Sequence, residues 1–241
     1  MTTVNLSAWL SSYQREQYVE PFKHMKEKHT FIMNTLFSDH MKSTDEHMKK
    51  LEAEYSTAFN YDVIDPGDVY EMIHEKAFQF YESEVLMEHN FHLLLLSNIY
   101  QIFEQQLRSF MYSTFNHKFS PVSTGPLKKF GLNMNELKDA FNHLDYDLTT
   151  NPHWNAIYTL SDIVNTFKHG DGRSAKRLHT TNPSFFKVDS NNHRIMDSEF
   201  TTNSAPVFDL NEIPFDNYAD AIISFWNTVP EHLSGTYTFT P

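Results

Sequence analysis

The 241-residue chain contains no cysteine. Disulfide bonds, thiolate nucleophiles and zinc or iron–sulfur sites held by cysteine are therefore excluded. Glycine is also scarce, with six residues where the average usage of about 7% would give roughly 17. The sequence has no GxGxxG, GxxxxGK[ST] or GxSxG pattern. The usual glycine-rich loops that hold nucleotide phosphates, and the nucleophile elbow of serine hydrolases, are absent from it.

Long apolar runs and an excess of basic residues are missing as well. No stretch approaches the ~18 apolar residues that span a bilayer, and the first residues lack the basic start and apolar run of a signal peptide. We therefore expect no membrane segment and a cytoplasmic location. The chain has 19 Lys and Arg against 31 Asp and Glu, a formal net charge of −12. This balance makes DNA an unlikely ligand and disfavours a membrane-surface role.

Aromatic residues are plentiful, with 21 Phe, 12 Tyr and 3 Trp. They supply the apolar area for a core, and apolar residues at three- and four-residue spacing predict a mainly α-helical fold. We expect one compact domain with three regions: a long N-terminal helical region over residues 1–60, a helical core over residues 61–179, and an appendage with a C-terminal helix over residues 180–241.

Local sequence features predict most of the helix boundaries. The amphipathic pattern from residue 21 to residue 59 is typical of one long helix. A second helical stretch without proline or glycine follows the turn at residues 65–68 and reaches residue 112, with residues 91–96 apolar nearly all round. Residues 117–131 are expected to form a loop, and Asn133 or Asn135 to cap a shorter helix. The most clearly bounded helix runs from Pro152 to Gly170.

The last region is predicted to be less regular. A short turn of helix is expected over residues 174–178, and weak alternation around Asn191-Asn192 favours a β-hairpin. The small irregular or β appendage therefore lies near residues 180–210. A final helix over residues 217–229 and an extended tail over residues 236–239 complete the chain.

The helix that ends before Gly170 carries two opposite faces. One is an apolar stripe of four residues: Ile157, Leu160, Val164 and Phe167. The other is a polar seam of four residues: Tyr158, Asp162, Asn165 and His169. Such a seam offers an imidazole, a carboxamide and a phenol to one ligand or to a second copy of the chain. The alternative is a solvated face on which His169 interacts favourably with the helix C-terminus.

A carboxylate on the earlier helix, Glu104, has two interpretations. In the first it pairs with Arg108 one turn later, an ordinary contact within a helix. In the second it reaches the helix that carries Asn165 and His169 and orients the imidazole. The sequence leaves both open.

Together, two segments resemble the HEPN superfamily of all-helical domains: Ile99-Tyr100-x-x-Phe103-Glu104-x-x-Leu107 and Asn165-x-x-Lys168-His169-Gly170. In that family a long helix with an acidic residue packs on a later helix that ends in an R-x4-6-H motif. The resemblance covers roughly residues 88–170. It implies a HEPN-like helical bundle and a homodimer that cleaves RNA without a metal or cofactor, in a toxin or antiviral defence pathway. His169 matches the catalytic histidine, Asn165 a polar residue that assists it, and Glu104 the acidic residue.

The chain departs from the family motif at its arginine. R-x4-H spacing places Val164 there, and six-residue spacing places Asp162. Arg108, Arg173 or Arg177 are candidate replacements. Phosphodiester cleavage without a fixed guanidinium loses an electrostatic contribution that is usually large. The alternative function is therefore a non-catalytic HEPN-like interaction or nucleotide-sensing module in a defence complex.

Basic residues flank the seam in an otherwise acidic chain, so RNA could dock there despite the net charge. The expected partner is RNA or another protein. With Tyr158, the expected substrate-binding residues are Lys168, Arg173 and Lys176. The same basic residues are also typical of helix ends and a solvated loop. A metal site is not expected, since Glu71-x-x-His74 has no second copy and His92, of His89-x-x-His92, falls in an apolar run that favours a hydrogen-bonded core histidine.

Overall fold

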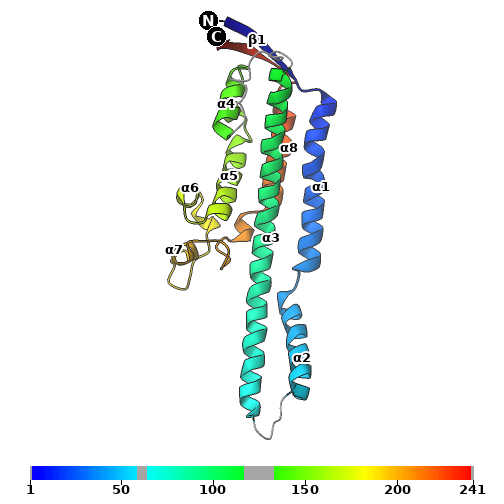
Figure 1. Ribbon diagram of the computed structural model, residues 1–241, viewed down its shortest axis with the longest axis vertical. Helices are drawn as coiled ribbons and strands as arrows, with labels where there is room; N and C mark the ends of the chain where they lie inside the picture. Colours follow the sequence, from blue (N-terminus) through cyan, green and yellow to red (C-terminus); the bar gives the residue numbers. More distant parts are fainter. Residues whose placement is uncertain (1, 59–63, 117–132, 240–241) are drawn as a thin grey trace.

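The computed structural model describes residues 2–58, 64–116 and 133–239 and confirms the mainly α-helical fold (Figure 1). The helices are α1 (Ser12–Leu36), α2 (His40–Ala58), α3 (Pro66–Asn116), α4 (Met134–Asn142), α5 (Trp154–His169), α6 (Arg173–Thr181), α7 (Ile195–Glu199) and α8 (Phe215–Thr228). The strands are β1 (Thr2–Trp9) and β2 (His232–Phe239). Single 3-10 turns are η2 (Leu148–Thr150), η3 (Pro183–Phe185) and η4 (Leu210–Glu212). No described helix combines the length and the apolar character that crossing a membrane requires.

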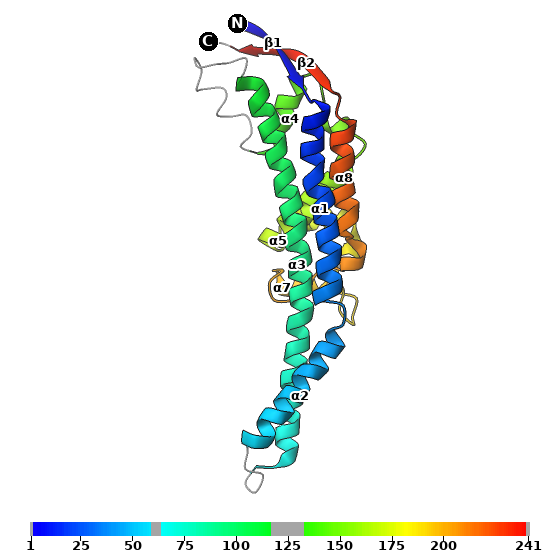
Figure 2. The same cartoon turned by 90° about the vertical axis from the view of Figure 1, so that its right-hand side faces the viewer.

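The C-terminal half of α3 is the axis of the bundle. Helices α1 and α8 lie along one side of it, and α4 and α5 along the other (Figures 1 and 2). Phe103 of α3 is fully buried and packs edge-on against Phe225 and Trp226 of α8, at centroid separations of 5.0 and 6.1 Å. Within the apolar run of residues 91–96, Leu93 and Leu96 are buried while Leu94 is 56% exposed. The run thus forms part of the core and part of the surface.

The N-terminal half of α3 extends beyond the bundle and carries α2 alongside it (Figures 1 and 2). We call α2 with residues 66–88 of α3 the arm. The single long helix expected over residues 21–59 is wrong in two respects. The helix begins at Ser12, and it breaks after Leu36, where the Asp39 carboxylate accepts the Lys42 N–H at 2.9 Å and starts α2. A short polar side chain at this point competes with the helical backbone for its N–H groups.

The two ends of the chain pair with each other. β1 and β2 form an antiparallel two-stranded sheet in which Leu6 lies opposite Gly235. Gly235 passes so close to the bundle that a Cβ there would lie 2.2 Å from the carbonyl oxygen of His143. The extended tail was expected at residues 236–239, but β1 was missed, because the partner that makes it a strand lies more than two hundred residues away.

The appendage near residues 180–210 is irregular, as expected. In place of a β-hairpin there is a tight turn closed by one bridge between Val188 and Arg194. The predicted cap Asn133 is confirmed, since its side chain accepts the N–H groups of the first turn of α4. The loop predicted over residues 117–131 lies outside the described residues.

Candidate functional site

Helix α5 places the polar seam, and its boundaries follow the prediction. Gly170 ends the helix with φ +70°, a conformation that favours glycine, and a Cβ there would lie 2.3 Å from the carbonyl oxygen of Phe200. Val164 is 1% exposed in the core. The position at which R-x4-H spacing requires arginine is therefore a packing position, and a guanidinium there would be buried without a partner.

The middle of the seam is occupied by an ion pair whose carboxylate is buried. Asp162 is 3% exposed, and both of its carboxylate oxygens accept from Arg177 of α6, one of them from Nε at 2.6 Å. The Arg177 guanidinium lies over the Tyr158 ring, 5.3 Å from its centroid, and Lys138 lies 5.5 Å from the same centroid. The pair raises the pKa of Arg177 further. Asp162 and Tyr158 thus hold α6 against α5.

The structure supports the first interpretation of Glu104, a pairing with Arg108 within its own helix. Its carboxylate accepts from the Arg108 guanidinium at 2.6 Å, one turn along α3. The expectation that Glu104 orients His169 is not met. Tyr100 of α3 hydrogen-bonds Ser161 of α5, and the two helices are antiparallel (Figure 1). Glu104 is therefore level with about residue 157, and about 18 Å along the helix axis from His169.

A short polar chain links the two helices at the level of Tyr100. Burial raises the pKa of the Tyr100 phenol, and its hydrogen bond with Ser161 acts in the opposite direction. Asn165 donates from Nδ2 to the Ser161 hydroxyl at 3.4 Å. Sequence reasoning missed Ser161 as the partner of Asn165 and of Tyr100, and only the i, i+4 spacing of Ser161 and Asn165 pointed to one of these contacts.

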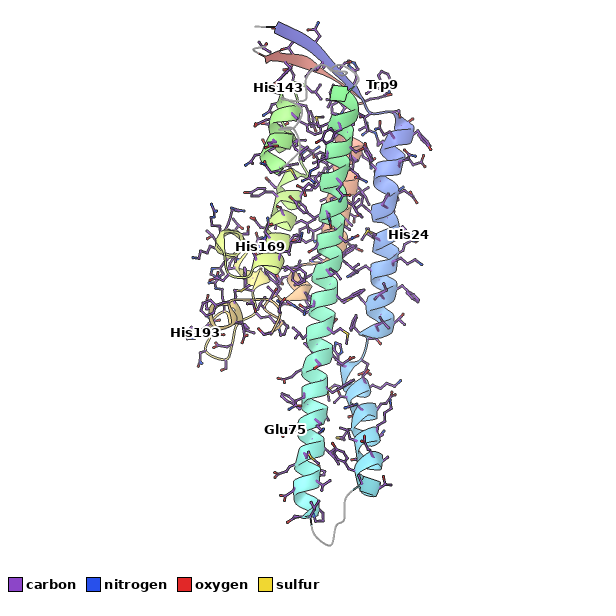
Figure 3. All side chains as sticks on the ribbon, in the orientation of Figure 1. Trp9, His24, Glu75, His143, His169 and His193 are labelled. Carbon is purple, nitrogen blue, oxygen red and sulfur yellow. The ribbon has the colours of Figure 1, made fainter. Side chains whose placement is uncertain are left out.

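His169 is the last residue of α5 and is exposed, on the side of the molecule that carries α6 and α7 (Figure 3). Lys168, Arg173 and Lys176 are exposed as well. No hydrogen bond or ion pair from these four side chains is found within the described ranges. We call residues 168–194 the basic lobe, since they contain six Lys and Arg against two Asp.

The seven expected site residues therefore divide into separate groups. Glu104 is paired with Arg108 on α3, and Asn165 with Ser161. Tyr158 lies about 16 Å from His169 along α5, since eleven residues separate them. The remaining residues, Lys168, His169, Arg173 and Lys176, are all exposed and lie close together in the sequence, at the end of α5 and the start of α6.

The histidine pair His89 and His92 is structural. His92 is buried and its Nε2 donates to the Ile213 carbonyl at 2.8 Å, so that Nδ1 accepts from His29 at 3.1 Å. His89 accepts the backbone N–H of Phe208 at 3.2 Å through Nε2. Burial lowers the pKa of each imidazole to about 4. The prediction of a hydrogen-bonded core histidine at position 92 is confirmed.

Within residues 2–58, 64–116 and 133–239, no three His, Asp or Glu side chains gather closely enough to hold a metal ion. The imidazole of His74, from the Glu71-x-x-His74 pattern, lies against the Tyr70 ring with centroids 4.2 Å apart. Comparisons with family models, with curated proteins and with solved structures found no match. Membership of the HEPN superfamily stays a prediction from the sequence.

Proposed function

We propose that this chain is a non-catalytic interaction module that binds an anionic protein surface through the basic side chains at the end of α5 and the start of α6. The arrangement of the expected active-site residues favours binding of a partner over cleavage of RNA. A general acid or base is most effective when a neighbouring group orients it and a charge stabiliser is held beside the reacting group. His169 has neither, since Glu104 is paired elsewhere and Arg177 is held by Asp162.

One observation carries the proposal: the ion pair between the buried Asp162 carboxylate and Arg177. It occupies the middle of the seam and fixes α6 against α5, whereas Arg173 and Lys176, on the same short helix, are exposed. Arg177 is thereby used for folding. The exposed residues remain available for a partner with negative charge.

The first experiment incubates the purified protein and the His169→Ala variant with mixed cellular RNA in EDTA. We expect no cleavage by either protein. Cleavage by the wild type that His169→Ala abolishes would overturn the proposal in favour of the metal-independent ribonuclease that the family resemblance implies.

The second experiment measures binding of a fluorescent polyglutamate peptide by anisotropy at low salt. The triple variant Lys168→Glu, Arg173→Glu, Lys176→Glu should bind at least ten times more weakly than the wild type. The matched control reverses three exposed lysines elsewhere, Lys23, Lys28 and Lys50, with the same change in net charge. Equal losses in both variants would show a net-charge effect and contradict a specific surface.

The defence or toxin setting, the cytoplasmic location and the homodimer belong to the same proposal. Of these three, the homodimer is the one on which the surface features of the molecule bear most directly.

A further inference from the structure

We infer that the anionic surface bound by the basic lobe is the arm of a second copy of this chain, so that two copies pair antiparallel about a two-fold axis with two arm-to-lobe contacts. This inference rests on the proposed function, because it names the partner of the same basic surface.

The arm carries an acidic stripe. We give this name to four exposed carboxylates of α3: Asp68, Glu71, Glu75 and Glu82. At 100° per residue they fall within about 60° of one another, so they share one helix face. None of them forms an ion pair in the described part of the chain. Like charges three or four residues apart destabilise a helix by a few tenths of a kcal/mol per pair, a cost that a cationic partner removes.

The acidic stripe points away from α2. Residues that pack on α2, such as Val69, Ile73 and Phe80, lie on the opposite face of α3, about 150° from the middle of the stripe. Figure 3 shows Glu75 on this free side, the side on which His169 and His193 of the basic lobe lie further along the molecule. The acidic stripe and the basic lobe therefore face the same side of the molecule, at different positions along the length of α3.

An apolar groove runs along α3 from Glu82 of the stripe to Phe167, the residue that precedes the basic lobe. It lies between α3 and the segment 203–206, which is tied to α5 by the bond from the Thr202 hydroxyl to the Phe167 carbonyl at 2.8 Å. One part, of about 530 Å³, is lined by Met87, Leu94 and Phe167. A second part, of about 480 Å³, begins at Glu82 of the stripe and shares Ser83 and Leu86 with the first.

The exposed apolar residues of the groove add a hydrophobic contribution to the binding free energy, beside the contribution of the charged side chains. Met87 and Leu94 are 51% and 56% exposed, which is unusual for large apolar side chains that are neighbours on one helix face. Their burial against a second copy would remove this area from water.

Charge complementarity favours a second copy over other partners. The arm contains ten Asp and Glu against four Lys, whereas the lobe contains six Lys and Arg against two Asp. Two of the six, Arg177 and Arg194, are paired with Asp162 and Asp197, and the other four remain for a partner. The lobe lies at the base of the arm. In an antiparallel pair, the lobe of the second copy therefore lies against the far half of the first copy's arm, and the lobe of the first copy lies against the second copy's arm. Each contact then occurs twice, and the assembly closes as a dimer.

The test uses two charge-reversal variants and light scattering after size exclusion at low salt. The stripe variant is Glu71→Lys, Glu75→Lys, Glu82→Lys, and the lobe variant is the triple reversal at positions 168, 173 and 176. We expect a wild-type dimer and a dimer dissociation constant at least about 100-fold higher for each variant alone. An equimolar mixture should dimerise again, since both of its contacts then join opposite charges. Helicity measured by circular dichroism confirms that both variants are folded.

A matched control reverses Glu16, Glu20 and Glu27, which are exposed on α1, and should leave the dimer intact. A monomeric wild type would overturn the inference, and so would a dimer that neither reversal weakens. Polyglutamate binding that depends on the lobe would in either case leave the proposed function standing. RNA cleavage lost in His169→Ala would instead remove the proposed function itself.

Discussion

The bundle and the arm are built from the same long helix but are held together differently. In the bundle α3 is surrounded, and Phe103, Leu96 and Trp226 are fully buried. In the arm α3 has α2 as its neighbour, and three buried residues, Leu51, Val69 and Ile73, form a separate small cluster. One sequence element thus serves as core in its second half and as surface in its first. The bundle supplies stability, and we propose that the arm supplies a face for association.

The largest difference should appear when one aromatic ring is removed from each region. Phe103→Ala in the bundle should lower the free energy of unfolding by about 4 kcal/mol, because a fully buried ring leaves a cavity. Phe78→Ala in the arm removes a ring that is 58% exposed and should cost less than about 0.5 kcal/mol. Urea denaturation followed by circular dichroism measures both. Equal effects would contradict the division between core and surface.

Acid should weaken the bundle through its buried histidines. His89 and His92 have pKa values lowered to about 4 by burial, against 6.5 in the unfolded chain. The unfolded state therefore binds more protons below pH 6.5, and stability is full above that pH and falls as the pH drops toward 4. At pH 5 the loss is about 2 kcal/mol for each histidine.

Urea denaturation at pH 7, 6 and 5 checks this dependence. In His92→Gln, which retains a polar side chain, the fall between pH 7 and pH 5 should be about half that of the wild type. A variant with the full wild-type slope would assign the acid sensitivity to other groups.

The ion pair in the seam joins the bundle to the basic lobe. Arg177→Ala leaves the Asp162 carboxylate buried without its partner and should destabilise the protein by about 2 kcal/mol, a value reduced because the arginine side chain is 43% exposed. Arg173→Ala, four residues away on the same helix, should change stability by less than about 0.5 kcal/mol. Thermal denaturation compares the two, and a larger effect at position 173 would contradict the structural role of the pair.

The smallest effect is expected in the arm cluster. Leu51→Ala truncates a buried residue at the edge of a three-residue cluster and should cost about 1–2 kcal/mol, since the site is close to solvent and can relax. The change should open the arm locally, and hydrogen exchange of arm amides should report it while bundle amides stay protected. Faster exchange throughout the bundle would show that the two regions unfold together.

Features set by local chemistry were predictable from the sequence. Asn133 caps α4 and Gly170 ends α5 because a short polar side chain and a residue tolerant of positive φ act within one turn of themselves. The apolar stripe of α5 was predicted for the same reason, since its spacing depends on the helix alone.

Features that depend on distant partners were not predictable. β1 becomes a strand only beside β2 at the other end of the chain. The sequence placed Asp162 in an open seam, whereas Arg177, fifteen residues later, closes it. Glu104 illustrates the same limit, because the register between α3 and α5 decides which residues it can reach, and that register depends on tertiary packing.

Cross-linking between copies tests the central claim most directly, because the chain has no cysteine of its own. One copy carries Gln79→Cys in the arm and the other carries Thr180→Cys in the lobe, and a short bis-maleimide is added at low salt. The account predicts a cross-linked dimer of the two copies that is lost at 0.5 M NaCl, where charges are screened within about 4–5 Å. A yield no higher than that of a control pair with Glu16→Cys on α1 in place of the arm cysteine would contradict it.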